Sequence, residues 1–475
     1  MKYDILIIGA GTAGMSCAIT AAQRGLKVGV IEKSNHVGGA MHWSGGHMSA
    51  GGTRLQKEKG IEDSVEKHLA DIYRINNKSG DLDLIELAVA EAPKTIEWLD
   101  ELGMEWASDC PRIIYGHVAY ETARTIYGPE KALSIYKVLY PQWEEKVASG
   151  NIECHFENTF IGLGKSEERF DTVICSTEDG ELSYSGKNIV ITSGGYGSNP
   201  AYFQQKHPNI PLVSSCYPTA TADGHVILEK HGGQFRYGEF HLPSLGGMEE
   251  EEGSGRVDFN ANWAMVLTSV YRQPRDIYVN TLGKRFIRED EVSPETRELA
   301  TMQQPNWCFW VVFDEAALNS PDENGNHNPI MIGRSVKEMK AEAERGHALR
   351  MANSIEELAE VTGLPMDNLK QTIAEYNTMV ETKTDLDFGR TYLKDPIKTA
   401  PFYALKVHAS VLVTFGGIKV NKDLQVLDAD GEPMSGIYAA GEVLGLGATS
   451  GSSFCSGMAI TPALGFGRIL GRTLS

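Results

Sequence analysis

The sequence lacks the marks of a membrane-spanning, metal-binding or nucleic-acid-binding protein. It has no uninterrupted apolar run of about 18 residues, the length that spans a bilayer. Its seven cysteines are dispersed, without the Cys-x-x-Cys spacing of zinc and redox motifs. A formal net charge of −19 disfavours a surface for nucleic acid or anionic lipid. These absences predict no membrane span, no nucleic-acid partner, no metal ligands and free thiols in a reducing compartment.

The start of the chain leaves no room for a signal peptide, because an apolar run already begins at residues 4–8. We therefore expect a cytoplasmic protein. The 475 residues are 41% hydrophobic and 23% charged, which is the composition of a globular protein. A chain of this length is expected to form two domains.

A strand, a glycine-rich turn, a helix and a second strand are predicted at the start of the chain. Residues 4–8 are a β-branched apolar run, which is typical of a buried parallel strand. The turn Gly9-Ala10-Gly11-Thr12-Ala13-Gly14 follows it, and residues 15–24 have the pattern of a helix. Residues 27–31 form the second expected strand, and Glu32 ends it. A Gly-x-Gly-x-x-Gly turn indicates dinucleotide binding when it lies between a strand and a helix in this order.

The three glycines of this turn have separate physical roles in dinucleotide binding. Gly9 permits the tight turn, Gly11 lets the backbone approach a pyrophosphate, and Gly14 lets helix and strand pack closely. The helix N-terminus then offers unpaired N–H groups to the phosphates. Glu32 is placed to accept hydrogen bonds from ribose hydroxyls. The sequence therefore predicts a nucleotide site in a Rossmann-type α/β domain.

Small residues after this unit favour FAD over NAD, because an extended FAD needs close backbone approach beyond the sheet edge. Gly441-Glu442 follows a late apolar strand, where a carboxylate can accept from ribityl hydroxyls. A helix starting near Ala459 can direct its N-terminus at the flavin. The residues predicted to bind FAD are Gly9, Gly11, Thr12, Ala13, Gly14, Glu32, Lys33, Gly39, Ala40, Ser44, Gly45, Gly46, Phe160, Ser193, Gly194, Asp223, Gly441, Glu442, Ala459 and Ile460.

These motifs belong to a recognisable set. The further members of the set are Gly38-Gly39, residues 191–199, 221–224, 279–286 and 416–420, and residues 438–443. With them the chain resembles the flavoproteins of the fumarate reductase and succinate dehydrogenase superfamily, especially its soluble single-chain branch and the 3-ketosteroid dehydrogenases. The resemblance implies hydride transfer between flavin N5 and a carbon of an activated C–C bond. It also implies an FAD-binding domain split in sequence (1–236 and 401–475) and an inserted α+β capping domain (237–400).

Three positions depart from the fumarate reductase pattern. Ser293 stands where that branch keeps a proton-donor arginine, four residues after Glu289. Val413 replaces a histidine, and Phe454 replaces the arginine that binds a substrate carboxylate. Together these departures predict against fumarate or succinate as the substrate. Gly39 stands where membrane-bound members attach the flavin to a histidine, so the FAD is expected to be non-covalent.

The C-terminal loop is closer to the 3-ketosteroid dehydrogenases. Gly457 matches the glycine whose N–H holds the substrate ketone, with Ser453 at the position of an assisting tyrosine. The resemblance therefore implies an enzyme that desaturates a cyclic ketone, by removing an α-proton and passing the β-hydride to the flavin. Such an enzyme binds a small carbonyl compound and passes electrons to a quinone, oxygen or a redox protein.

The base for such a reaction is open. Tyr115, Tyr120 and Tyr127 lie close together in one segment, and Ser293 maps to the base tyrosine of the ketosteroid branch. A tyrosine base needs a lowered pKa, which nearby arginines can give. Arg272 and Arg275 are the candidates. The candidate catalytic residues are thus Gly457, Ser453, Tyr115, Tyr120, Arg272, Arg275 and Ser293.

Two alternatives to desaturation stay open at this point. One is an ene-reductase that saturates an activated C=C bond, similar to fumarate or urocanate reductase. The other is a non-catalytic flavoprotein, or an electron-transfer subunit of a larger complex.

Overall fold

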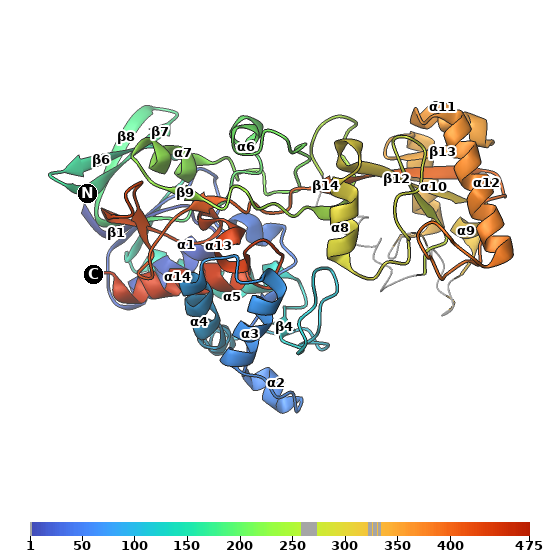
Figure 1. Cartoon of the computed structure of the whole chain (residues 1–475). Helices are drawn as coiled ribbons and strands as arrows, with labels where there is room; N and C mark the ends of the chain where they lie inside the picture. The colour runs from blue at the N-terminus through green and yellow to red at the C-terminus, as the bar shows by residue number, and fades with distance from the viewer. Residues whose placement is uncertain (1, 258–272, 322–324, 326–329, 331–333) are drawn as a thin grey trace.

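The computed structural model describes residues 2–257, 273–321, 325, 330 and 334–475. Figure 1 shows two lobes. The larger lobe contains both ends of the chain, and the smaller lobe, called the cap below, is built from the middle of the sequence. The predicted fold class, a split Rossmann-type α/β domain with an inserted α+β domain, is confirmed.

The larger lobe is built on a mixed sheet with strand order β16-β17-β8-β1-β2-β5. The five strands from β17 to β5 run parallel, with Ile5 opposite Val28 and Ile189 opposite Ile437. Their apolar side chains are buried, as expected for a sheet covered on both faces. The strands are β1 (Lys2–Ile8), β2 (Val28–Ile31), β5 (Ile152–His155), β8 (Gly180–Ile191), β16 (Gln425–Leu427) and β17 (Pro433–Ala439), with β6 (Thr159–Ser166) and β7 (Arg169–Thr177) paired antiparallel beside β8.

Helices from both ends of the sequence cover this sheet. α1 packs against α14, and α14 packs against α4, so the N-terminal and C-terminal segments share one core. The helices of this lobe are α1 (Thr12–Gln23), α2 (Arg54–Glu58), α3 (Val65–Asn76), α4 (Leu82–Glu101), α5 (Ala132–Ala148), α6 (Pro200–Lys206), α7 (Asp223–Lys230), α13 (Leu446–Ser450) and α14 (Ile460–Thr473), with the 3-10 turns η1 (Gly39–His42) and η4 (Glu442–Leu444). Two small antiparallel sheets complete the lobe. One is formed by β3 (Met48–Ser49) and β4 (Thr125–Ile126), and the other by β9 (Phe235–Arg236) and β15 (Gly417–Ile418).

The cap is an antiparallel sheet with helices on both faces. Its order is β10-β14-β12-β11, with β13 also paired to β14. β12 alternates as a strand should: Phe309 and Val311 face one apolar cluster, whereas Trp310 and Val312 face another. The elements are β10 (Ser244–Gly247), β11 (Ile277–Asn280), α8 (Pro294–Met302), η3 (Pro305–Trp307), β12 (Cys308–Asp314), α9 (Glu315–Asn319), α10 (Val336–Arg345), β13 (Leu349–Ala352), α11 (Ile355–Thr362), α12 (Met366–Thr382) and β14 (Phe402–Ser410).

The cap sheet extends past the boundary that the sequence suggested. β14 follows residue 400 and pairs with β12 along its whole length, for example Val311 with Leu405. The chain then returns to the larger lobe, where the N–H of Thr414 donates to Glu442. The domain limits themselves stay a prediction.

The described part of the chain agrees with two expectations from composition, which concern membrane spans and cysteines. No helix there is long and apolar enough to cross a membrane. All seven cysteines are free thiols.

Candidate active site

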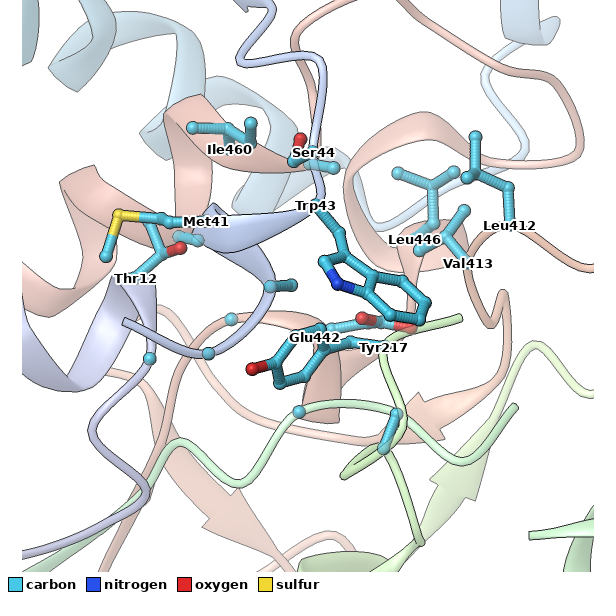
Figure 2. A pocket seen from close by; sticks show the side chains of 18 of the residues that line it. Thr12, Met41, Trp43, Ser44, Tyr217, Leu412, Val413, Glu442, Leu446 and Ile460 are labelled. Carbon is cyan, nitrogen blue, oxygen red and sulfur yellow. The ribbon is translucent and has the colours of Figure 1, made fainter. Parts of the chain in front are cut away.

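A cavity of about 610 Å³ runs along the carboxyl end of the parallel sheet. Figure 2 shows Thr12 and Met41 at one end and Leu412, Val413 and Leu446 at the other. Both lobes line it. The larger lobe supplies the turn after β1, the end of β2, η1 and the start of α14, and the cap side supplies Ser244, Leu245, Pro294, Arg297 and Glu298, with Leu412 and Val413 just after β14. This is the crevice where open α/β sheets bind their ligands.

All the residues predicted to bind FAD line this cavity, with the exception of Gly14. A side chain at Gly14 would collide with the carbonyl of Gly9 and would lie 2.9 Å from Thr192 Oγ1. Gly14 therefore serves the close packing of α1 against the sheet, which is the role expected of the third glycine of the turn.

The turn after β1 leaves space that fits a dinucleotide. Gly9 has φ of +100°, and a Cβ there would lie 2.6 Å from the carbonyl oxygen of Thr192. Gly11 lines the cavity, and a Cβ there would meet nothing within 4 Å, so a side chain would project into open space. Gly11 also precedes the first residue of α1, whose N-terminus has no side-chain cap. The backbone N–H groups at this helix end are thus directed at the cavity and suit a pyrophosphate.

A carboxylate of the cavity wall is suited to accept hydrogen bonds from nucleotide hydroxyl groups. The carboxylate of Glu32 accepts hydrogen bonds from the N–H groups of Ala10 and Ser34, both at 2.8 Å, which fixes it at the end of β2. Its oxygens keep further lone pairs for ribose hydroxyls. Lys33, next to it, forms a 2.7 Å ion pair with Asp223.

Glu442 is the second carboxyl group of the cofactor region. Its Oε1 accepts from the N–H and the hydroxyl of Thr414, both at 3.0 Å. Burial raises the pKa of this carboxyl group. Gly441, with φ of +84°, allows the turn that brings Glu442 from β17 into the cavity. In Figure 2, Glu442 lies beside the rings of Trp43 and Tyr217, whose centroids are 5.4 Å apart. The glycine turn, the helix end and these carboxyl groups together fit FAD.

The opposite end of the cavity has a different lining. α8 begins at Pro294, and its first turns bring Arg297 and Glu298 to the cavity. Both side chains are buried. Burial raises the pKa of the Glu298 carboxyl well above its usual range, although the charge of Arg297 opposes this shift. This shift favours the protonated form of Glu298 over what an exposed glutamate would show.

This pair is not predicted from the sequence, because the fourth residue after Glu289 is Ser293. Ser293 is the N-cap of α8, with its hydroxyl accepting from the N–H of Thr296, and it does not line the cavity. Glu289 is occupied by a buried ion network with Arg285 and Arg390, at 2.8 and 3.0 Å. The sequence does contain a signal for this helix: a serine followed by a proline is typical of a helix N-terminus. Residues in the first two turns of such a helix are candidates for the site.

Of the three tyrosines in the segment proposed to supply the base, Tyr127 lines the cavity, but burial and its hydrogen bond to Asp109 raise its pKa. Tyr115 is exposed and lies outside the cavity lining. Tyr120 is buried, its hydroxyl donates to the carbonyl of Ser456 at 2.7 Å, and it does not line the cavity either. Burial raises the pKa of Tyr120 well above its usual range, because desolvation outweighs the nearby charge of Arg124. The expectation of a lowered tyrosine pKa is therefore corrected for Tyr120.

The other predicted catalytic residues are scattered. Gly457 lines the cavity with φ of +78°. Ser453 is buried but lies outside the lining. Arg275 donates to the carbonyl of Pro321 at 2.8 Å and pairs with Asp395 at 3.6 Å, away from the lining. Arg272 lies outside the described residues.

Comparison with known proteins identifies the family. A family model described as an FAD binding domain matches residues 4–458. The chain belongs to this FAD-binding family. It is an FAD-dependent oxidoreductase that acts on CH–CH bonds, as its recognised relatives do.

Curated relatives and solved structures agree with the resemblance found in the sequence. Urocanate reductase of Eggerthella lenta is 28% identical over 98% of this chain and 74% of its own. A probable fumarate reductase of Shewanella frigidimarina is 26% identical over 98% of this chain and 74% of its own. The open conformation of a flavocytochrome c3 fumarate reductase superimposes with a TM-score of 0.77 at 25% identity, over 99% of this chain and 77% of that chain. The 3-ketosteroid Δ1-dehydrogenase of Sterolibacterium denitrificans, with a TM-score of 0.77 at 19% identity over 100% of this chain and 99% of that chain, shares the fold.

Proposed function

We propose that this chain is an ene-reductase that saturates an activated C=C bond. The observation that carries the proposal is the pair Arg297 and Glu298, because it brings a cation and a carboxyl group with a raised pKa to the cavity. A carboxyl group with a raised pKa, placed beside a cation, can act as a general acid that donates a proton to a substrate. Two of the tyrosines considered for removing a proton, Tyr115 and Tyr120, stand outside the lining, and burial raises the pKa of Tyr120. The two curated relatives named above are reductases, which supports the same direction.

Saturation of the C=C bond adds one hydride and one proton. FAD, when bound and reduced, supplies the hydride. Arg297 and Glu298 are our candidates for delivering the proton to the neighbouring carbon and for stabilising negative charge on the activating carbonyl. The cap also contributes the apolar side chains of Leu245 and Pro294 to the cavity lining.

The substrate in this proposal is not a dicarboxylate. Among the described residues that line the cavity, the cations are Lys33, Arg112 and Arg297. Lys33 pairs with Asp223 at 2.7 Å and Arg112 pairs with Asp109 at 2.8 Å, so both of these cations are engaged by carboxylates of the chain itself. Val413 and Phe454, at the positions of the missing histidine and arginine, line the same cavity with apolar surface.

Anaerobic stopped-flow spectroscopy tests the direction of the reaction. The reduced holoprotein is mixed with acrylate, fumarate, trans-cinnamate or 2-cyclohexenone, and the return of the oxidised flavin band is followed. We expect at least one monofunctional alkene to reoxidise the flavin faster than fumarate does. If no alkene reoxidises it, and cyclohexanone or a steroid ketone instead bleaches the oxidised protein, the chain is a desaturase. A protein that responds to none of these compounds would support an electron-transfer role. The electron partner stays a prediction: a reductase needs a donor where a desaturase needs an acceptor.

A further inference from the structure

The substrate end of the cavity contains a stacked aromatic pair made by His117 and Phe454. Their ring centroids are 3.8 Å apart and their planes meet at 17°. The two residues come from distant parts of the sequence, and both line the cavity. Phe454 packs on the apolar cluster that contains Val413 and Leu446, which Figure 2 places at the end away from Thr12. The pair therefore lies away from the glycine turn.

His117 behaves as an uncharged ring in this pair. Burial, and to a smaller extent the charge of His47, lower the pKa of His117 to about 3. The Nδ1 atom of His117 is buried and has no hydrogen-bond partner among the described residues. Stacking on Phe454, rather than a hydrogen bond at this atom, holds the ring in place. The result is a flat, uncharged surface.

The surroundings of this surface are apolar as well. Ile114, Leu412, Val413 and Leu446 line the cavity with the aromatic pair. A compact carboxylate gains nothing from such walls, whereas a planar conjugated ring gains both burial and stacking. Aromatic pairs add about 0.5–1.5 kcal/mol to the free energy of simple burial.

We infer that the C=C bond reduced here is conjugated to a planar aromatic ring, which stacks on the surface formed by His117 and Phe454. The substrate class is an arylacrylate-type compound with one activating carbonyl or carboxylate group. This inference rests on the proposed function and narrows it: the α8 pair acts at the carbonyl side, and the aromatic pair receives the ring.

The test compares two alkenes that differ by the ring alone. Reduced holoprotein is mixed anaerobically with trans-cinnamate or with acrylate, and kcat and KM are measured for each. We expect KM for cinnamate to be lower than KM for acrylate by about 10-fold or more, since each 1.4 kcal/mol of binding free energy is tenfold. Phe454→Leu removes the ring but keeps an apolar side chain, and we expect it to raise KM for cinnamate about 10-fold, so that the preference for cinnamate over acrylate is largely lost. Phe454→Tyr restores the ring and is expected to return KM for cinnamate to near the wild-type value.

A matched control is offered by Phe240. It packs on the same apolar cluster as Phe454 and is stacked on Tyr237 with centroids 5.5 Å apart, but it does not line the cavity. Phe240→Leu makes the same chemical change, and we expect both KM values to stay unchanged. If Phe454→Leu and Phe240→Leu give equal KM values for cinnamate, or if wild type does not prefer cinnamate to acrylate, the aromatic inference fails while the reductase stands. If neither alkene is reduced by any variant, the proposed function fails first.

Discussion

The two ends of one cavity are built in opposite ways. At the end near α1, the surface is mostly backbone: glycines without side chains, a helix N-terminus and two carboxyl groups fixed by N–H donors. At the end under the cap, the surface consists of side chains from separate segments, among them His117, Arg297, Val413 and Phe454. A surface made mostly of backbone has a fixed shape, and here that shape suits a dinucleotide. A side-chain surface can be changed residue by residue, so it is where substrates are distinguished.

This comparison predicts that the two ends can be disabled independently, and the largest effect is expected at Arg297. In Arg297→Gln the cavity loses its cation beside Glu298. We expect turnover with the best alkene to fall about 10²–10⁴-fold, the range for losing a group that transfers a proton or stabilises developing charge. The flavin content per chain, read from the ratio of flavin to protein absorbance, should stay at the wild-type value.

Arg345→Gln is the control for this change, because Arg345 is an exposed arginine of the cap helix α10. It should turn over like wild type. A fully active Arg297→Gln protein would remove α8 from the mechanism.

The next largest effect concerns the turn itself. Gly9→Ala forces a Cβ to within 2.6 Å of the Thr192 carbonyl at φ of +100°, and it should cost about 2–5 kcal/mol of unfolding free energy together with most of the bound flavin. Gly25→Ala is the matched change, because Gly25 also has a positive φ, +83°, but its Cβ would meet nothing within 4 Å. We expect Gly25→Ala to lose about 1–2 kcal/mol and no flavin. Urea unfolding and flavin absorbance measure both quantities, and equal losses in the two variants would contradict the packing argument.

The cofactor end of the cavity can be predicted from the sequence better than the substrate end, because it is built from local backbone patterns. The glycine turn, Glu32 and the Gly441-Glu442 step are local patterns, and each is tied by chain geometry to a strand that the apolar residues already reveal. The fold and the cofactor end were therefore predictable. Phe454 was recognised as an anomaly in the sequence, but its stacking on His117 depends on the packing of two distant segments. No spacing in the chain encodes that contact.

The errors at the substrate end have the same origin. The prediction of Ser293 as a catalytic residue depends on its distance of four residues from Glu289. That distance contains no information on where α8 begins or on which face of α8 meets the cavity. Tyr120 was selected by residue type, whereas its pKa is decided by burial, which the sequence does not display.

A smaller effect separates binding from folding at the cofactor end. Gly11 has φ of −80°, which alanine adopts freely, and its Cβ would enter open space in the cavity. Gly11→Ala should therefore leave the melting temperature of the FAD-free protein unchanged. It should weaken FAD binding about 10- to 100-fold, because crowding a fitted site costs about 1–3 kcal/mol. Fluorescence titration of the apoprotein with FAD measures the affinity, and Gly162→Ala, in β6 outside the cavity lining, is the control. Unchanged FAD affinity in Gly11→Ala would show that the pyrophosphate does not pass this residue.

The smallest effect is expected at Glu298, and its sign follows from burial. The folded protein keeps the Glu298 proton to a higher pH than the unfolded chain does, because the pKa of the buried carboxyl is raised. The stability from this group is thus fully present below the unfolded pKa, and it is lost as the pH rises toward the folded pKa, at about 1.4 kcal/mol per pH unit. Glu298→Gln has no proton to lose, so its melting temperature should fall less than that of wild type between weakly acidic and alkaline pH. Glu360→Gln removes an exposed carboxyl group from the cap helix α11, outside the cavity lining, and it should follow the wild-type curve. If the curves of wild type and Glu298→Gln run parallel, Glu298 is already ionised in the folded protein, and Arg297 is then left without a protonated neighbour in the cavity.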